Sequence, residues 1–212
     1  MRLNTILALT IVLLPLTTHA ATTQPFILGA DISWVPEDEA DGATYFDHGV
    51  QKDIFQILHD NQFNMIRLRV FVHPHAPHGY AAGKAEAFCD LAHTLAMAKR
   101  AQAAGMGLLI SLHYSDTWTN PEGHPKPHAW DGMTVEQLAG AVHDHTRDVL
   151  AALKDQGTPA DMVAIGNEVT HGMLWPEGRV WSHIPSGNAQ TDAANTNLGP
   201  GNGNYDNFAT FL

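Results

Sequence analysis

An asparagine–glutamate pair directly follows a short apolar segment toward the end of the chain. Asn167 and Glu168 come after Met162–Ile165, whose composition is typical of a buried β-strand. A carboxylate at such a strand end suits a general acid that protonates a leaving oxygen, and apolar neighbours would raise its pKa by desolvation. Glycoside hydrolysis uses such an acid together with a second carboxylate. The pair is predicted to supply one half of a catalytic couple, the alternative being that it only caps a turn.

Ring-bearing and acidic side chains gather after another apolar run, 106–112. His113, Tyr114, Asp116 and Trp118 follow it closely, and an imidazole, a phenol and an indole can contact sugar hydroxyls or stack on a pyranose ring. We expect these four residues to bind a carbohydrate. For Tyr114 and Asp116, a structural role in holding the loop is the alternative.

Three further residues occupy comparable places after predicted strands. Trp34 and Trp175 are interpreted either as additional sugar platforms or as loop anchors. Asp31 ends the first predicted strand, where it could brace the active-site network or form a turn ahead of Ser33.

These residues need a scaffold whose strands end together. Four apolar runs alternate with stretches of helical period, an order that indicates a parallel sheet with right-handed connections. The loops after the strands are long and rich in Trp, His, Asp and Pro, as in a barrel with its site at the carboxyl face. Since a TIM (β/α)8 barrel needs roughly 250 residues, we expect an α/β fold with only the N-terminal half, about four βα units. The predicted strands are 26–32, 65–72, 106–112 and 162–165, and the predicted helices are 50–60, 89–104, 134–157 and one that begins near Tyr205.

The first 20 residues have the composition of a secretory signal peptide. Arg2 precedes the apolar run Ile6–Leu16, and small residues flank a cleavage site after Ala20. Residues 21–212 are then predicted to be a truncated part of a secreted catalytic domain, extracellular or periplasmic, with no membrane span after cleavage. Ser182–Asn204, rich in Gly, Asn and Thr, is interpreted as a flexible excursion. Such a half-barrel would leave two sheet edges open to aggregation or pairing.

Charge and cysteine content exclude several classes of function. The net charge is −11 and no basic cluster is present, so nucleic acid is not an expected partner. The low content of charged residues and the several Trp and Tyr residues are typical of a protein that binds a neutral ligand by hydrogen bonds and stacking. The single cysteine, Cys89, cannot form an internal disulfide and is predicted to be a buried structural thiol.

Six short blocks along the chain resemble, in order and spacing, those of arabinogalactan endo-β-1,4-galactanases, glycoside hydrolase family 53. The resemblance covers nearly all of residues 26–212. It implies a TIM barrel, a retaining mechanism, and a polysaccharide partner, the β-1,4-galactan or arabinogalactan of pectic side chains. The blocks are Gly29–Pro36, Lys52–Phe55, Ile66–Val70, His113–Trp118, Ile165–Glu168 and Gly172–Gly178.

The resemblance also implies roles for individual residues. Glu168 matches the acid/base, and Asn167 matches the neighbour that hydrogen-bonds the sugar 2-hydroxyl. In the alternating segment Ile66–Arg69 both arginines lie on one face. Arg69 is expected to brace the nucleophilic carboxylate, whereas Arg67 could equally fill a layer of the barrel interior.

The chain departs from the family pattern in two small ways and one large one. Ser111 stands where many members have Asp, and Thr119-Asn120 replaces Ala-Asp. The family's nucleophilic Glu lies on strand seven, beyond Leu212, and Glu177 is the only nearby spare carboxylate. We therefore expect little or no activity from this chain alone, and activity from a full-length monomer. No cofactor is expected, although calcium is possible in the missing half.

Three alternative functions remain open from the sequence. A catalytic metal is disfavoured because His143 and His145, two apart in a predicted helix, point in different directions. A non-catalytic galactan-binding half-barrel would use the same tryptophans without cleaving. A related clan A glycosidase could instead act on mannan, xylan or cellulose.

Overall fold

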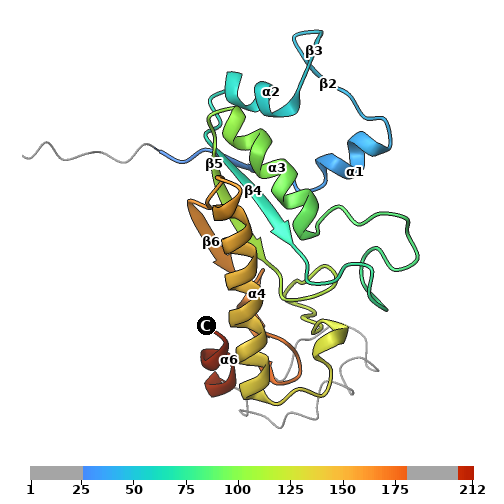
Figure 1. Ribbon diagram of the computed structural model, residues 1–212, viewed down its shortest axis with the longest axis vertical. Coiled ribbons are helices and arrows are strands. Elements are labelled where there is room, and N and C mark those ends of the chain that lie inside the picture. The colour runs from blue at the N-terminus through green and yellow to red at the C-terminus, as the bar shows by residue number, and fades with distance from the viewer. Residues whose placement is uncertain (1–25, 181–204) are drawn as a thin grey trace, which may run out of the picture.

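A four-stranded parallel sheet runs through the centre of the molecule (Figure 1). The computed structural model describes residues 26–180 and 205–212. The predicted signal peptide and the Ser182–Asn204 excursion therefore lie outside the described residues. The strands are ordered β1-β4-β5-β6, and every neighbouring pair is parallel. Because the strands run the same way, their carboxyl ends meet at one edge of the sheet.

The strands coincide closely with the predicted apolar runs. They are β1 (Gly29–Asp31), β4 (Met65–Val70), β5 (Gly107–Leu112) and β6 (Met162–Ile165). The register places Asp31 beside Arg67, Arg69 beside Ser111, and Ser111 beside Ala164. Polar side chains are thereby aligned across neighbouring strands on one face.

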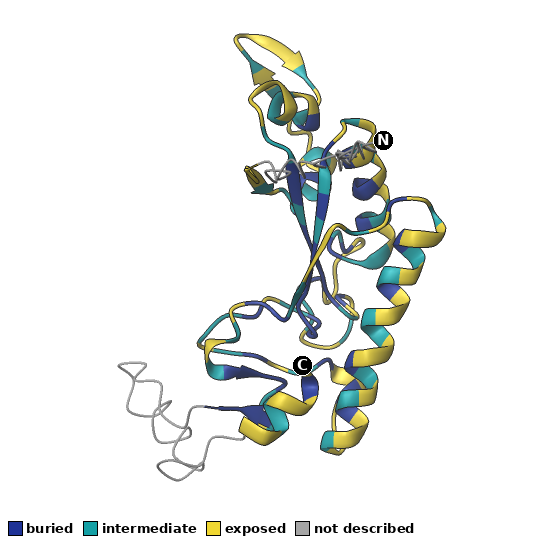
Figure 2. Ribbon diagram, turned by 90° about the vertical axis from the view of Figure 1, so that its left-hand side faces the viewer, coloured by how far each residue is buried: buried dark blue, intermediate teal, exposed yellow. Residues whose placement is uncertain are grey.

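The other face of the sheet carries the apolar core. Ile66, Leu68, Leu108 and Ile110 are all buried, since helices cover this face in right-handed connections. Figure 1 shows α3 (Leu91–Ala103) crossing β4 and β5, and Figure 2 shows the long helix α4 (Val135–Asp155) alongside the sheet. The two-residue period of the strands thus separates an apolar face under helices from a polar face that is free for chemistry.

Side-chain hydrogen bonds cap the starts of both α3 and α4. The Thr134 hydroxyl accepts from Gln137 N–H at 3.3 Å, while the Gln137 side chain accepts from Thr134 N–H at 2.8 Å, which forms a capping box. Asp90 caps α3, so that helix begins two residues later than Cys89. Cys89 itself is buried, and burial raises the pKa of its thiol to about 12.

The first predicted helix is wrong at its start. Residues Val50–Lys52 form β3, which pairs with β2 (Tyr45–Asp47) in a hairpin, and Val50 is exposed rather than turned inward. The helix α2 (Ile54–Asp60) begins only after Asp53, whose side chain accepts from Phe55 N–H at 2.8 Å.

Short elements that the sequence did not predict lie around the sheet. They are the helix α1 (Val35–Ala40), the hairpin of β7 (Gly172–Met173) and β8 (Gly178–Arg179), and single turns at His128–Trp130 and Val169–His171. The predicted helix near Tyr205 is α6 (Tyr205–Phe211), which packs beside α4 (Figure 1). Among the described helices, none is long and apolar enough to cross a membrane.

Candidate active site

Asp31 anchors a polar network at the carboxyl ends of the strands. One carboxylate oxygen accepts from the Ser33 hydroxyl at 2.6 Å and from Ser33 N–H at 3.1 Å. The other oxygen accepts from Arg69 at 2.9 Å and also from Arg67. Burial by itself would raise the pKa of Asp31, but the Ser33 hydrogen bonds and the charges of Arg69 and Arg67 outweigh it, so this pKa lies below its ordinary value. The prediction that Asp31 braces the site is supported by these four contacts.

Arg67 connects all four strands. While one terminal nitrogen binds Asp31, the other donates to Ser111 Oγ at 2.8 Å and to Asn167 Oδ1 at 2.7 Å. These partners belong to β1, to β5 and to the end of β6, and Arg67 itself lies on β4. The guanidinium fork, which offers several donors in one plane, suits this role. Arg67 thus helps to hold Asn167 in place at the edge of the sheet.

Arg69 lies against two tryptophan rings and has donors to spare. Its side chain is only 6% exposed, and its guanidinium carbon lies 4.9 Å from the Trp34 ring centroid and 4.4 Å from that of Trp118. Such contacts stabilise a cation that has lost its water. Its Nε and Nη1 are buried and have no hydrogen-bond partner among the described residues. Both nitrogens therefore remain available to donate to a further acceptor.

The two tryptophans differ in what remains free for a ligand. The Trp34 ring also meets Tyr80 edge-on at 5.2 Å and is half-buried, an arrangement typical of an anchor for Arg69. Trp118 is 41% exposed, although it contacts Arg69 and His113. Trp118 is thus the better candidate for stacking on a sugar ring.

His113 is almost completely enclosed. It is 1% exposed, meets Phe71 at 5.1 Å, and its Nδ1 lies 3.0 Å from Thr119 Oγ1. Burial, followed by the positive charges of Arg69 and Arg67, lowers the pKa of His113 to about 3. The imidazole is therefore neutral near pH 7.

Asn167 and Glu168 follow β6 in very different environments. Asn167 is buried, accepts from Arg67, and donates one amide hydrogen to Thr119 O at 2.7 Å, which leaves one hydrogen for a ligand. Glu168 is exposed and adopts the left-handed conformation, with φ 52° and ψ 44°. The predicted desolvation of Glu168 by apolar neighbours is wrong for the described residues, because the turn after Gly166 directs it to solvent.

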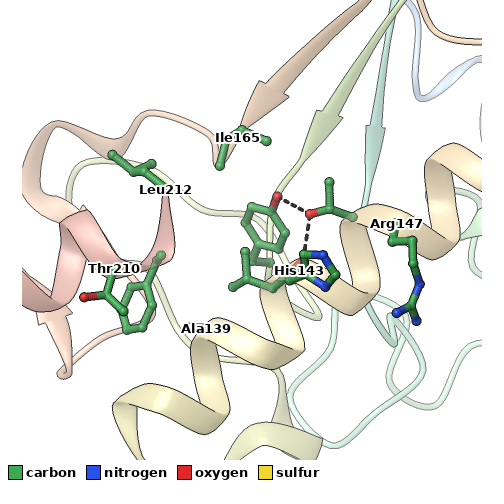
Figure 3. A pocket seen from close by; sticks show the side chains of 10 residues that line it. Ala139, His143, Arg147, Ile165, Thr210 and Leu212 are labelled. Carbon is green, nitrogen blue, oxygen red and sulfur yellow. Dashed lines mark hydrogen bonds between the residues drawn. The ribbon is translucent and has the colours of Figure 1, made fainter.

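Two predicted sugar-binding residues have structural roles instead. Tyr114 is 1% exposed and points toward α4, where its hydroxyl lies 2.8 Å from Thr146 Oγ1. It lines a pocket of about 400 Å³ shared with α4 and α6, not the network around Asp31 (Figure 3). Asp116 is buried, and its carboxylate accepts from His73 N–H at 2.8 Å and His128 N–H at 2.7 Å. Both residues fulfil the alternative that the sequence left open, and their assignment to substrate is corrected.

Replacing Tyr114 by phenylalanine is expected to lower the free energy of unfolding by about 1 kcal/mol, the usual worth of one hydrogen bond. Urea denaturation would measure this loss. The double variant with Thr146→Val should cost less than the sum of the two single changes, because they share one bond. Carbohydrate binding should be unchanged, and a clear loss of it in Tyr114→Phe would contradict the structural assignment.

Trp175 lies in the segment between β7 and β8. The Trp175 indole donates to His171 O at 3.2 Å, and the Arg179 guanidinium lies 4.3 Å from its centroid. Trp175 also borders a pocket of about 390 Å³, so both the platform and the anchor interpretations stay open. Glu177, expected to be spare, accepts from Lys126 Nζ at 2.6 Å and is therefore engaged.

The histidine and acidic side chains of the described residues are also candidate metal ligands. Within residues 26–180 and 205–212, no group of three or more His, Cys, Asp or Glu side chains is arranged to hold a metal ion.

Comparison with known proteins agrees with this geometry. The family model described as glycosyl hydrolase family 53 matches residues 27–211. An arabinogalactan endo-β-1,4-galactanase from Cellvibrio japonicus is 39% identical over 197 residues, which are 92% of this chain and 50% of that protein. The chain spans about half the length of the curated relatives it matches.

Solved structures give the same result. A structure from a study of two fungal β-1,4-galactanases matches with a TM-score of 0.68 and 33% identity, over 86% of this chain and 46% of that one. A family 53 catalytic domain from Ignisphaera aggregans matches with a TM-score of 0.67 and 38% identity, over 78% of this chain and 46% of that one. Together with the parallel sheet, these matches confirm the predicted fold class, a (β/α) barrel of which the described residues form four strands.

Proposed function

This chain belongs to glycosyl hydrolase family 53, and from that membership we propose that it carries the acid/base half of an endo-acting, retaining β-1,4-galactanase. The substrate would be the galactan or arabinogalactan side chains of pectin, and the enzyme would be a secreted monomer. The relatives named arabinogalactan endo-β-1,4-galactanase support both the type of bond cleaved and the polymer. The composition of residues 1–20 supports secretion.

One observation carries the proposal. Arg67 joins Asp31, Ser111 and Asn167 into a single network, so the end of β6 is fixed relative to the three neighbouring strands. Glu168 follows directly and extends from this edge toward solvent, in a backbone conformation that few glutamates adopt. A rigid base under an exposed carboxyl group is what proton transfer to a large, solvent-borne polymer requires.

We assign the steps of the reaction as follows. Glu168 protonates the leaving galactosyl oxygen while a nucleophilic carboxylate attacks the anomeric carbon, and Glu168 then takes a proton from the water that releases the sugar. The remaining amide hydrogen of Asn167 would bind the 2-hydroxyl. Trp118 would stack on a pyranose ring, and His113 would contact a hydroxyl.

Arg69 is assigned to the nucleophile. By the family resemblance this carboxylate is a glutamate on the seventh barrel strand, which is neither the short β7 (Gly172–Met173) nor one of the four parallel strands of the described sheet. The Nε and Nη1 of Arg69, which are buried and have no hydrogen-bond partner among the described residues, are available as donors to this carboxylate. Because retention needs both carboxyl groups roughly 5 Å apart, we expect residues 1–212 by themselves to release no product.

A chimera tests the proposal. Residues 1–212 would replace the matching half of the Cellvibrio japonicus galactanase, and product release would be measured on linear β-1,4-galactan, mannan, xylan and a soluble cellulose. We expect galacto-oligosaccharides from galactan alone. A chimera that folds but prefers another glycan would contradict the substrate assignment. Hydrolysis by residues 1–212 without the second half would contradict the division of the two carboxylates.

A further inference from the structure

Thr119 connects two groups that face the candidate site. It is 1% exposed, and its hydroxyl lies 3.0 Å from His113 Nδ1 and 3.5 Å from the backbone oxygen of Asn167. Its own backbone oxygen accepts from the Asn167 side-chain amide at 2.7 Å. One buried threonine thus contacts the His113 imidazole and both the backbone oxygen and the side-chain amide of Asn167. No role in the reaction has been assigned to it above.

The direction of these hydrogen bonds follows from the chemistry of the partners. A backbone oxygen can only accept, and a threonine hydroxyl has a single hydrogen. When that hydrogen goes to Asn167 O, the hydroxyl oxygen is left to accept from His113, whose Nδ1 must then carry the proton. This arrangement satisfies all three groups, whereas donation from Thr119 to Nδ1 leaves Asn167 O without the hydroxyl. A buried polar group without a hydrogen-bond partner destabilises the folded protein.

The opposite ring nitrogen of His113 is consistent with the same arrangement. Nε2 is buried and has no hydrogen-bond partner among the described residues. Burial lowers the pKa of His113 to about 3, so the ring is neutral and only one nitrogen carries hydrogen. With the hydrogen on Nδ1, Nε2 presents a lone pair and is an acceptor.

We propose that Thr119 is a positioning residue that holds His113 in the Nδ1–H tautomer, so that Nε2 accepts a hydrogen bond from a substrate hydroxyl. The identity of that hydroxyl as one of a galactosyl unit rests on the proposed function. Thr119 also orients the Asn167 amide, whose free hydrogen donates. One sugar hydroxyl would then donate to Nε2 of His113, and another would accept from the Asn167 amide. A sugar without the first hydroxyl would leave Nε2 without a hydrogen-bond partner.

Nitrogen-15 NMR of the uniformly labelled chain at pH 7 tests this directly, because protonated and unprotonated ring nitrogens have well separated shifts. The His113 signals are identified as those absent from a His113→Gln variant. We expect the Nδ1–H tautomer to dominate in the wild type and in Thr119→Ser, which keeps the hydroxyl. Thr119→Val, which keeps the shape but not the hydroxyl, should lose this dominance and move toward Nε2–H.

Two results would overturn the proposal. One is a dominant Nε2–H tautomer in the wild type, a measurement that stays decisive even if Thr119→Val fails to fold. The other is an unchanged tautomer in a folded Thr119→Val protein. Addition of β-1,4-galactotetraose distinguishes the role of Thr119 in fixing the tautomer from the contact between His113 and the sugar. A change in the Nε2 chemical shift supports the sugar contact. If the ring is in the Nδ1–H form but the Nε2 shift does not change with sugar, the role of Thr119 is supported and the sugar-binding function is contradicted.

Discussion

Galactan hydrolysis by the chimera is expected to fall about 10³-fold when Glu168 is replaced by glutamine, within the range of about 10²–10⁴ that general acid–base catalysis contributes. The glutamine amide keeps the size of the side chain but cannot give its proton to a leaving galactosyl oxygen. The loss should therefore depend on the leaving group. A dinitrophenyl galactoside, whose phenolate leaves without protonation, should form the glycosyl-enzyme nearly as fast in the variant as in the parent. Burst kinetics would measure that first step.

The matched control is Glu122→Gln, since Glu122 is exposed on the loop after β5 and outside the network. It should retain the activity of the parent on both substrates. Equal losses on galactan and on the dinitrophenyl galactoside in Glu168→Gln would instead assign Glu168 as the nucleophile, and no loss on either would remove it from the chemistry.

Replacing Asp31 by asparagine is expected to lower the free energy of unfolding by about 2–3 kcal/mol, less than the loss of one partner from a fully buried ion pair, because the Asp31 side chain is 23% exposed. The change leaves Arg67 and Arg69 close together without the carboxylate that now separates their charges. Urea denaturation at neutral pH would measure the loss. The exposed pair of Asp148 and Arg147 offers the control, and Asp148→Asn should cost below about 1 kcal/mol.

The effect of Asp31→Asn should depend on pH in a definite direction. The folded protein holds the pKa of Asp31 below its ordinary value, which the unfolded chain retains at about 3.9. The carboxylate therefore contributes its full stability above about pH 4. That contribution is lost as the pH falls through the lower, folded value. The gap between wild type and Asp31→Asn should narrow below about pH 4. A gap that stays constant down to pH 2 would contradict the network's role in holding Asp31 charged.

The sheet could be predicted from sequence because its signal is local. Runs such as Met65–Val70 are apolar on the helix side and bounded by polar loops, and β6 was predicted with the bounds it has. The hairpin before α2 was missed because Val50 and Ile54 have helical spacing. Its two-residue turn is His48-Gly49, with φ of 47° and 80°, and His-Gly is a much weaker signal than Asn-Gly for such a turn.

The sequence indicated candidate residues at the strand ends but not the contacts between them. Residue types at strand ends indicated Asp31, Arg69 and Glu168. Only tertiary structure could show that Arg67 reaches a partner 100 positions along the chain. Tyr114 was assigned to substrate because it lies beside His113, yet its left-handed backbone, with φ of 50°, directs the phenol toward α4. Ser111 and Thr119 stood out in the sequence only as departures from a pattern, without any indication of the groups they bind.

The turn between β6 and Glu168 also restricts which sequences can carry this site. At Gly166, with φ of 78°, an added Cβ would lie 2.4 Å from a Val169 methyl carbon, so random mutagenesis should find no tolerated replacement there. Two residues later, Glu168 has a left-handed backbone, a conformation that glycine adopts at a free energy lower by roughly 1 kcal/mol. A library of variants screened for thermal stability alone would therefore favour replacement of Glu168 by glycine, which removes the carboxylate. Any directed evolution of this chain needs an activity screen at every round.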